Sequence, residues 1–278
     1  MMKTTTVASA IALLASLTTV STVQAQDCEY QRDYDIELDA AQIQALEIDA
    51  EAGPLEIRGQ GSDAIQITAR ACASSEDALD GVTLQYERRG DRWEVISETD
   101  VNDGWFFGWT RDNYAYLEMT VVAPKGIALD VDDGSGSLII ADWEGSIEID
   151  DGSGSIELSN ILGSVDIDDG SGSIHLVDGE GDIDLEDGSG DIDISRWTGN
   201  IFLNDGSGDM NITQIVGHVT VDDDGSGPIA IEDIDGDVRI DEDGSGSIDV
   251  YRVTGDLSIG SAGSGGLHFN DIDGNVSM

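Results

Sequence analysis

Apolar and polar residues alternate along the second half of the chain in units of about nine residues. A glycine opens each unit, and the second and fourth residues after it are apolar, as in Gly136-Ser-Leu-Ile-Ile140. The unit occurs sixteen times between residues 136 and 278, and all thirty-two of these positions are apolar. Two-residue alternation is typical of a strand with one buried face, and a glycine before each strand indicates a turn with unusual backbone angles or close backbone approach. The pattern predicts a stack of short strands.

Two such units form one coil, because alternate turns differ in sequence. One set of turns reads Asp-Gly-Ser-Gly, first at 133–136 and last at 243–246. The other set has an apolar residue two positions before its glycine, with Gly179 as the exception: Trp143, Ile161, Trp197, Ile215, Ile234, Val253 and Ile272. We therefore expect an all-β fold, a β-solenoid (β-helix or β-roll) of about eight coils of 18 or 19 residues, with an N-terminal β capping region.

Three regions follow from the changes in composition along the chain. Residues 1–25 contain Lys3, an apolar run and a small-residue ending at Ala25, a pattern typical of a cleaved secretory signal peptide. Residues 26–125 hold longer alternating runs and most of the arginines and aromatics, which indicates an N-terminal β region that caps the first coil. Residues 126–278 are the solenoid repeats. The signal predicts export, to the periplasm or to the cell surface and medium.

Export makes the two cysteines interpretable. In an oxidising compartment Cys28 and Cys72 most simply form a disulfide, although two buried free thiols are the alternative. The closed loop would contribute roughly 4 kcal/mol in the chain-entropy model.

The formal net charge of −46 restricts the partners of this protein. Such a surface repels nucleic acid and anionic lipid headgroups, so we expect no nucleic-acid partner, and no later segment is apolar enough for membrane insertion. Divalent cations are attracted to it. Solvation of a secreted protein in high salt explains the same charge without any ligand.

The Asp-Gly-Ser-Gly turns place aspartates at equivalent positions of successive coils. Their carboxylates should repel one another at a strand spacing of about 4.8 Å, and Ca²⁺ between coils would remove the repulsion. The alternative is an Asx turn, in which each carboxylate accepts a hydrogen bond from the backbone N–H two residues later. The Asx turn requires no cofactor. The candidate calcium ladder is Asp133, Asp151, Asp169, Asp187, Asp205, Asp224 and Asp243, reinforced by Asp132, Asp150, Asp168, Glu186, Asp223 and Glu242.

One concentrated aromatic segment could contact a glycan or a protein, since flat aromatic rings give contact area at low entropic cost. It comprises Trp105, Phe106, Phe107 and Trp109. The alternative is a lid that folds back onto the solenoid. We predict no catalytic residues, because the three histidines are far apart in sequence and no serine or cysteine has a paired base. A carbohydrate-active enzyme that uses surface Asp or Arg is a further alternative.

The segment from Leu117 to Ser137, a strand ending in Pro-Lys-Gly and running into Gly-Ser-Gly, resembles the DUF4097 family, whose members are often labelled adhesins. Gly188-Ser-Gly-Asp-Ile-Asp-Ile194 and Ile234-Asp-Gly-Asp-Val-Arg-Ile240 match its two alternating strand types. The resemblance implies an exported, non-catalytic bacterial β-solenoid that acts by surface contact with an unidentified envelope or surface ligand, protein or glycan. Because Met278 falls inside a repeat, we also expect self-association through an uncapped C-terminal coil. The rival function is a calcium-binding structural β-roll.

Overall fold

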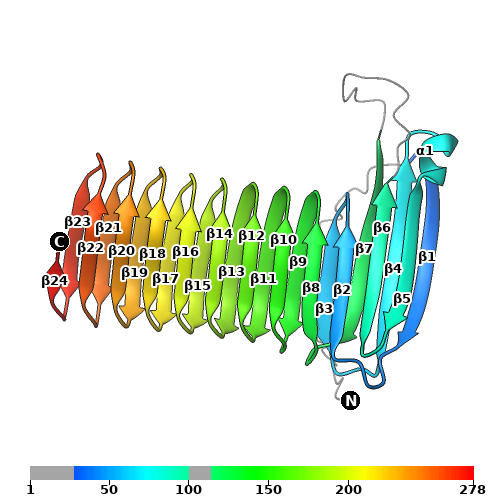
Figure 1. The fold of residues 1–278 in the computed structure, drawn as a ribbon, viewed down its shortest axis with the longest axis horizontal. Coiled ribbons are helices and arrows are strands. Elements are labelled where there is room, and N and C mark those ends of the chain that lie inside the picture. Colours follow the sequence, from blue (N-terminus) through cyan, green and yellow to red (C-terminus); the bar gives the residue numbers. More distant parts are fainter. Residues whose placement is uncertain (1–27, 100–113) are drawn as a thin grey trace, which may run out of the picture.

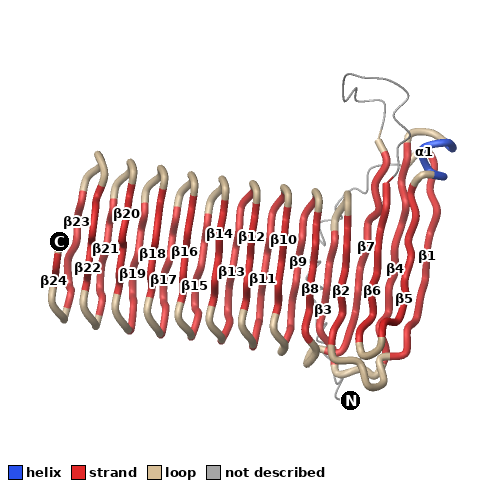
Figure 2. Tube along the Cα trace, viewed as in Figure 1, coloured by secondary structure: helices blue, strands red, loops and turns tan. Residues whose placement is uncertain are grey.

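The computed structural model describes residues 28–99 and 114–278, which form an elongated rod of two facing β-sheets (Figures 1 and 2). Each sheet has twelve strands. Sheet A contains, in spatial order, β1 Tyr30–Asp39, β4 Ala64–Ala73, β7 Ala115–Pro124, β3 Leu55–Gln60, β9 Gly136–Trp143, β11 Gly154–Leu162, β13 Gly172–Glu180, β15 Ile192–Thr198, β17 Met210–Val216, β19 Ile229–Asp235, β21 Ile248–Val253 and β23 Leu267–Ile272.

Sheet B has the same length and lies opposite. It contains, again in spatial order, β5 Val82–Arg89, β6 Arg92–Thr99, β2 Ala45–Ala50, β8 Ala128–Asp133, β10 Ile147–Asp151, β12 Val165–Asp169, β14 Ile183–Asp187, β16 Ile201–Asp205, β18 Val219–Asp224, β20 Val238–Asp243, β22 Leu257–Ala262 and β24 Val276–Ser277. From β8 onward the chain passes alternately from one sheet to the other and every lateral pairing is parallel, for example Ile147 with Val165 and Ile156 with Ile174. The predicted all-β solenoid is confirmed.

The N-terminal strands continue both sheets in an order that differs from the order of the chain. β2 and β3 pair in parallel with β8 and β9 in register, Leu46 beside Leu129 and Leu55 beside Leu138. On their other side lie β6 and β7, also parallel, and beyond these the sheets end in antiparallel strands β5, β4 and β1. Both sheets therefore continue from the N-terminal strands into the regular coils without a break. The domain boundary between residues 125 and 126 stays a prediction.

The interior of the rod is a continuous apolar core. The inward residues two and four positions after each turn glycine are fully buried from Leu138 to Leu257 and almost so at Ile259. The apolar row at the second set of turns is buried as well from Trp143 to Val253, and Ile272 in the last coil is partly buried. The Nε1–H groups of Trp143 and Trp197 donate to the carbonyls of Ile127 and Gly181. Burial of this row explains why the two sets of turns differ in sequence.

The coils lengthen from 18 to 19 residues because of a β-bulge. β18 shifts register against β16 between Leu203 and Asn204, so Asp222 has no partner and Asp223 lies beside Asn204. An extra residue in one strand of a pair bends that strand and raises its twist. The next two coils keep the longer repeat, with Asp224 beside Asp243 and Asp243 beside Ala262.

The predicted disulfide is present: Cys28 is bonded to Cys72 of β4, with their Cα atoms 5.3 Å apart. It fastens the start of the described chain to the antiparallel end of sheet A. A single short helix, α1 Glu76–Asp80, follows β4, and the Ser75 side chain caps it by accepting from the Ala78 N–H. Across residues 28–99 and 114–278, no helix has the length and apolar character needed to cross a membrane.

Replacing a turn glycine should collapse a coil, and Gly172→Ala tests this. Gly172 has φ +156°, and a Cβ built there would lie 1.5 Å from the carbonyl oxygen of Gly154 in the preceding coil. We expect a loss of more than about 3 kcal/mol in the free energy of unfolding, because backbone atoms must move. Gly126→Ala is the control, since no atom lies within 4 Å of its Cβ position. Equal melting curves for the two variants would contradict this account of the turn.

Candidate functional site: a buried column of aspartates

The last inward-facing position of seven consecutive strands of sheet B is an aspartate. In β8 the buried residues are Leu129, Val131 and Asp133, at every second position, so the aspartate continues the apolar row of its strand. Parallel register places each aspartate beside its equivalent in the next coil. We call this set the aspartate column: Asp133, Asp151, Asp169, Asp187, Asp205, Asp224 and Asp243, all between 0 and 5% exposed.

One carboxylate oxygen in the middle of the column forms the expected Asx turn. The Oδ1 atoms accept hydrogen bonds from the backbone N–H two residues later, at 2.9–3.0 Å, in four turns. The four pairs are Asp151 with Ser153, Asp169 with Ser171, Asp187 with Ser189, and Asp205 with Ser207. The aspartates are therefore turn formers whose side chains point into the rod, a direction that the sequence analysis did not specify.

The second carboxylate oxygen of these aspartates is buried without a partner. Oδ2 of Asp151, Asp169, Asp187 and Asp205 has no donor, and neither oxygen of Asp133, Asp224 or Asp243 has one. An ionised carboxylate loses much hydration energy when it is buried unpaired. Two full charges about 4.8 Å apart also repel by about 3.5 kcal/mol at an effective dielectric constant of about 20. The column is thus a poor place for seven negative charges.

Burial accordingly raises the pKa of every member. The pKa rises from 3.8 to about 7 for Asp133, Asp187 and Asp224 and to about 6 for Asp151, chiefly through burial and further through neighbouring carboxylates. At Asp151 and Asp187 the backbone hydrogen bond of the Asx turn opposes the increase in pKa. The pKa values of Asp169, Asp205 and Asp243 are raised for the same main reason.

The acids that flank the column in sequence do not join it. They alternate with it along each strand and are exposed on the outer face of sheet B: Asp132, Asp150, Asp168, Glu186, Asp223 and Glu242. Within the two described ranges, no three or more His, Cys, Asp or Glu residues form a group that could hold a metal ion. The calcium ladder stays a prediction.

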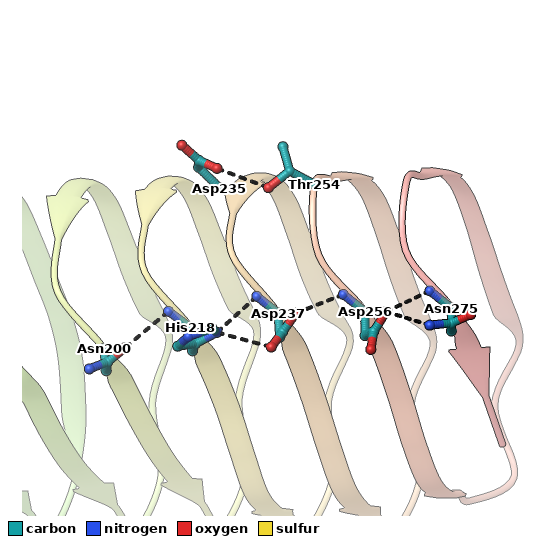
Figure 3. A network of polar contacts seen from close by, with 7 residues as sticks. All are labelled: Asn200, His218, Asp235, Asp237, Thr254, Asp256 and Asn275. Atoms are coloured by element: carbon teal, nitrogen blue, oxygen red, sulfur yellow. Dashed lines mark hydrogen bonds and ion pairs between the residues drawn. The ribbon is translucent and has the colours of Figure 1, made fainter.

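A second polar row runs along the edge formed by the other set of turns. Each member follows a turn glycine, and its side chain accepts a hydrogen bond from the backbone N–H of the same position in the next coil (Figure 3). Asn200 accepts from the backbone N–H of His218 at 3.2 Å, and His218 Nδ1 accepts from the backbone N–H of Asp237 at 3.0 Å. Asp237 and Asp256 continue the row. Sequence analysis missed it, although an acceptor residue follows every second glycine from Gly181 to Gly274.

The candidate contact segment Trp105, Phe106, Phe107 and Trp109 lies outside the described residues. The described residues on either side of the undescribed stretch, Thr99 and Tyr114, are held by hydrogen bonds to the N-terminal part of the rod. The Thr99 N–H and hydroxyl donate to Glu51 Oε2 at 2.6 and 2.8 Å. Tyr114 exchanges hydrogen bonds with Ser74, which accepts from the Tyr114 N–H through Oγ and donates its own N–H to the Tyr114 carbonyl.

Comparison with known proteins gives only distant similarity. No family model matches the chain, and no curated protein matches it. Among solved structures, the chain is similar to a "putative cell adhesion protein" from Clostridium sporogenes (TM-score 0.29, 9% identity, 90% of this chain and 100% of that one). It is also similar to a "putative adhesin" from Bacteroides fragilis (0.34, 14%, 88% and 96%) and a "putative lipid binding protein" from Parabacteroides distasonis (0.33, 16%, 88% and 96%). These scores are too low to support an argument about function.

Proposed function

We propose that this protein is an exported, non-catalytic β-solenoid of the bacterial envelope that acts by surface contact, in the manner of an adhesin of the DUF4097 type. The observation that supports the proposal is the geometry of the rod's end. Thr99 and Tyr114, the described residues on either side of the stretch that contains the aromatic segment, are hydrogen-bonded to Glu51 and Ser74, and β6 and β7 next to them belong to the two long stacked sheets. A binding segment carried on a stiff support can be presented away from the surface that bears the protein.

The chemistry of the partner follows from the charge of the chain. A net charge of −46 disfavours polyanions such as nucleic acid and anionic lipid surfaces. Aromatic side chains bind the apolar faces of sugar rings and the exposed apolar or cationic groups of proteins. A surface glycan or an envelope protein is therefore the class of ligand that we propose, reached after export to the periplasm or the cell exterior.

Replacing Trp105, Phe106, Phe107 and Trp109 together by serine should weaken binding to bacterial surface glycans or envelope proteins by at least about tenfold, since aromatic anchors supply most of the energy of such contacts. The fluorescently labelled chain can be applied to a glycan array and to immobilised envelope fractions. Phe202→Ser is the matched control, because Phe202 is 50% exposed on the outer face of sheet B, in strand β16 of the regular coils. Binding retained by the quadruple variant, or an equal loss in the quadruple variant and the control, would contradict the proposal.

A further inference from the structure

The aspartate column is a buried row of carboxyl groups with a non-acidic residue at each end. Ala50 of β2 lies in register beside Asp133 at one end, and Ala262 of β22 lies beside Asp243 at the other. Ala50 is buried, and all seven aspartates are at least nine-tenths buried. The carboxyl groups are therefore bounded by alanine methyl groups at both ends of the row and have little contact with water.

The charged groups that act on the column are themselves carboxylates. On its own strands, Asp132, Asp150, Asp168 and Asp223 lie one residue before a column member and raise its pKa. From the turn that leads into β15 of sheet A, Asp191 does the same for Asp205. None of the charged groups acting on the column is an arginine, lysine or histidine. Neutrality must come from protons or from bound metal ions.

The arrangement of donors and acceptors favours protons. Oδ1 is occupied by a serine N–H in the middle of the column, which leaves Oδ2 as the atom able to carry a hydrogen. A protonated carboxyl group is both a donor and an acceptor, so a stack of such groups can satisfy its own oxygens. Calcium needs six to eight oxygen ligands. The acids that could add to the column's own oxygens instead face outward from sheet B.

We propose that the column is a proton-binding site, a ladder of carboxylic acids in which protonated aspartates donate from Oδ2 to a carboxyl oxygen of the aspartate in the neighbouring coil. The protons are taken up from water as the solenoid folds. No bond other than O–H is made, and unfolding returns the protons to solvent. The ladder neutralises a row of turn-forming aspartates without metal, and it makes the stability of the rod depend on proton concentration. This inference is independent of the proposed adhesin function.

Infrared spectroscopy of the folded, EDTA-treated chain at about pH 6 tests the proposal directly. Exposed carboxyl groups are ionised at that pH, so the C=O stretching band of a protonated carboxyl group reports the column. We expect the band to be present and to weaken in the triple variant Asp169→Asn, Asp187→Asn, Asp205→Asn. Asparagine keeps the Oδ1 acceptor of the Asx turn, so the variant retains its turn hydrogen bonds. The matched control is Asp166→Asn, Glu186→Gln, which removes two exposed acids of strands β12 and β14 that do not act on the pKa of a column member, and it should leave the band unchanged.

Three results would overturn the proposal. The first is a folded protein with no protonated carboxyl band, which means that the column is ionised. The second is a band that persists in the triple variant at its original intensity and therefore arises elsewhere. The third is a chain that unfolds in EDTA and refolds only when Ca²⁺ is added, which would establish the column as the calcium ladder instead. The melting curve of each sample, with and without Ca²⁺, separates these results from simple failure of a variant to fold.

Discussion

Lowering the pH from about 8 to about 5 is expected to stabilise this protein by at least about 4 kcal/mol, equivalent to an increase of about 10 °C in melting temperature. Asp133, Asp187 and Asp224 have pKa values of about 7 in the folded chain, against 3.8 in the unfolded chain. Between these values the folded protein binds more protons than the unfolded chain, so the free energy of unfolding increases as the pH falls. The stability that these protonated aspartates contribute is fully present below about pH 3.8 and is lost as the pH rises through about 7.

Arginine-paired acids act in the opposite sense but outside this range. Arg196 and Arg252 lower the pKa of Asp178 and Asp233, respectively. Stability from these pairs is present above the unfolded pKa and is lost only as the pH falls below it. Their side chains are about half exposed, so screening by solvent keeps their contribution small. The melting temperature should therefore pass through a maximum on the acid side of neutrality.

A single pair of variants separates the column from the general charge of the chain. Asp187→Asn should raise the free energy of unfolding at about pH 8 by about 2 kcal/mol or more and change it little at about pH 5, because the wild-type carboxyl is already neutral there. Glu186→Gln removes the same charge from the next residue, which is exposed, and should change stability by less than about 0.5 kcal/mol at either pH. The measurement is urea unfolding at both pH values. Equal responses of the two variants would mean that net charge alone governs the pH dependence.

Most of the solenoid could be predicted from the sequence, because the pattern of glycine and apolar residues that specifies each coil is local and is repeated. The glycine-spaced pairs such as Leu138 and Ile140 determine which face of each strand is buried, and both are buried as expected. The order of the first coils was not predictable. The apolar residues of β2 and β3 fit any site in the stack equally well, and the placement of β2 between β6 and β8 depends on contacts distant in sequence.

The inward direction of the column was present in the sequence but hidden by the chemistry of its residues. Leu129, Val131 and Asp133 are spaced by two, which places the aspartate on the buried face. Burial of aspartate is rare, however, and a turn next to glycine is usually exposed, so composition argued for solvent. Residue type and periodicity therefore point in opposite directions at these positions, and the structure follows the periodicity.

The exception to the apolar row, Gly179, is explained by the residue beside it. Parallel register places Gly179 of β13 next to Trp197 of β15. A Cβ built on Gly179 would lie 2.1 to 2.5 Å from three carbon atoms of the Trp197 indole. The tryptophan ring therefore occupies the space that an isoleucine fills in other coils. The equivalent positions 179 and 197 of two neighbouring coils are thus filled by a single large side chain, that of Trp197.

Gly179→Ile alone should destabilise the protein by more than about 3 kcal/mol, because the indole of Trp197 is fully buried and has no free space to move into. Trp197→Ile alone should cost about 3–5 kcal/mol through the cavity it leaves and the lost hydrogen bond to the Gly181 carbonyl. The double variant restores the Ile–Ile pairing of neighbouring coils, such as Ile215 with Ile234. Its loss of stability should be at least about 2 kcal/mol smaller than the sum of the single losses.

A double-mutant cycle by urea unfolding measures that coupling. The control cycle uses Ile161→Val and Ile215→Val, two buried positions of the same row that do not pair with each other. Each should cost about 0.5–1.5 kcal/mol, and the two should add. If the stability losses of Gly179→Ile and Trp197→Ile add, the presence of glycine at position 179 has another cause. One such cause is the positive φ of +57° at the preceding residue, Asp178. Coupling confined to this pair would instead show that packing between coils, and not turn geometry, selects the residue at the apolar edge.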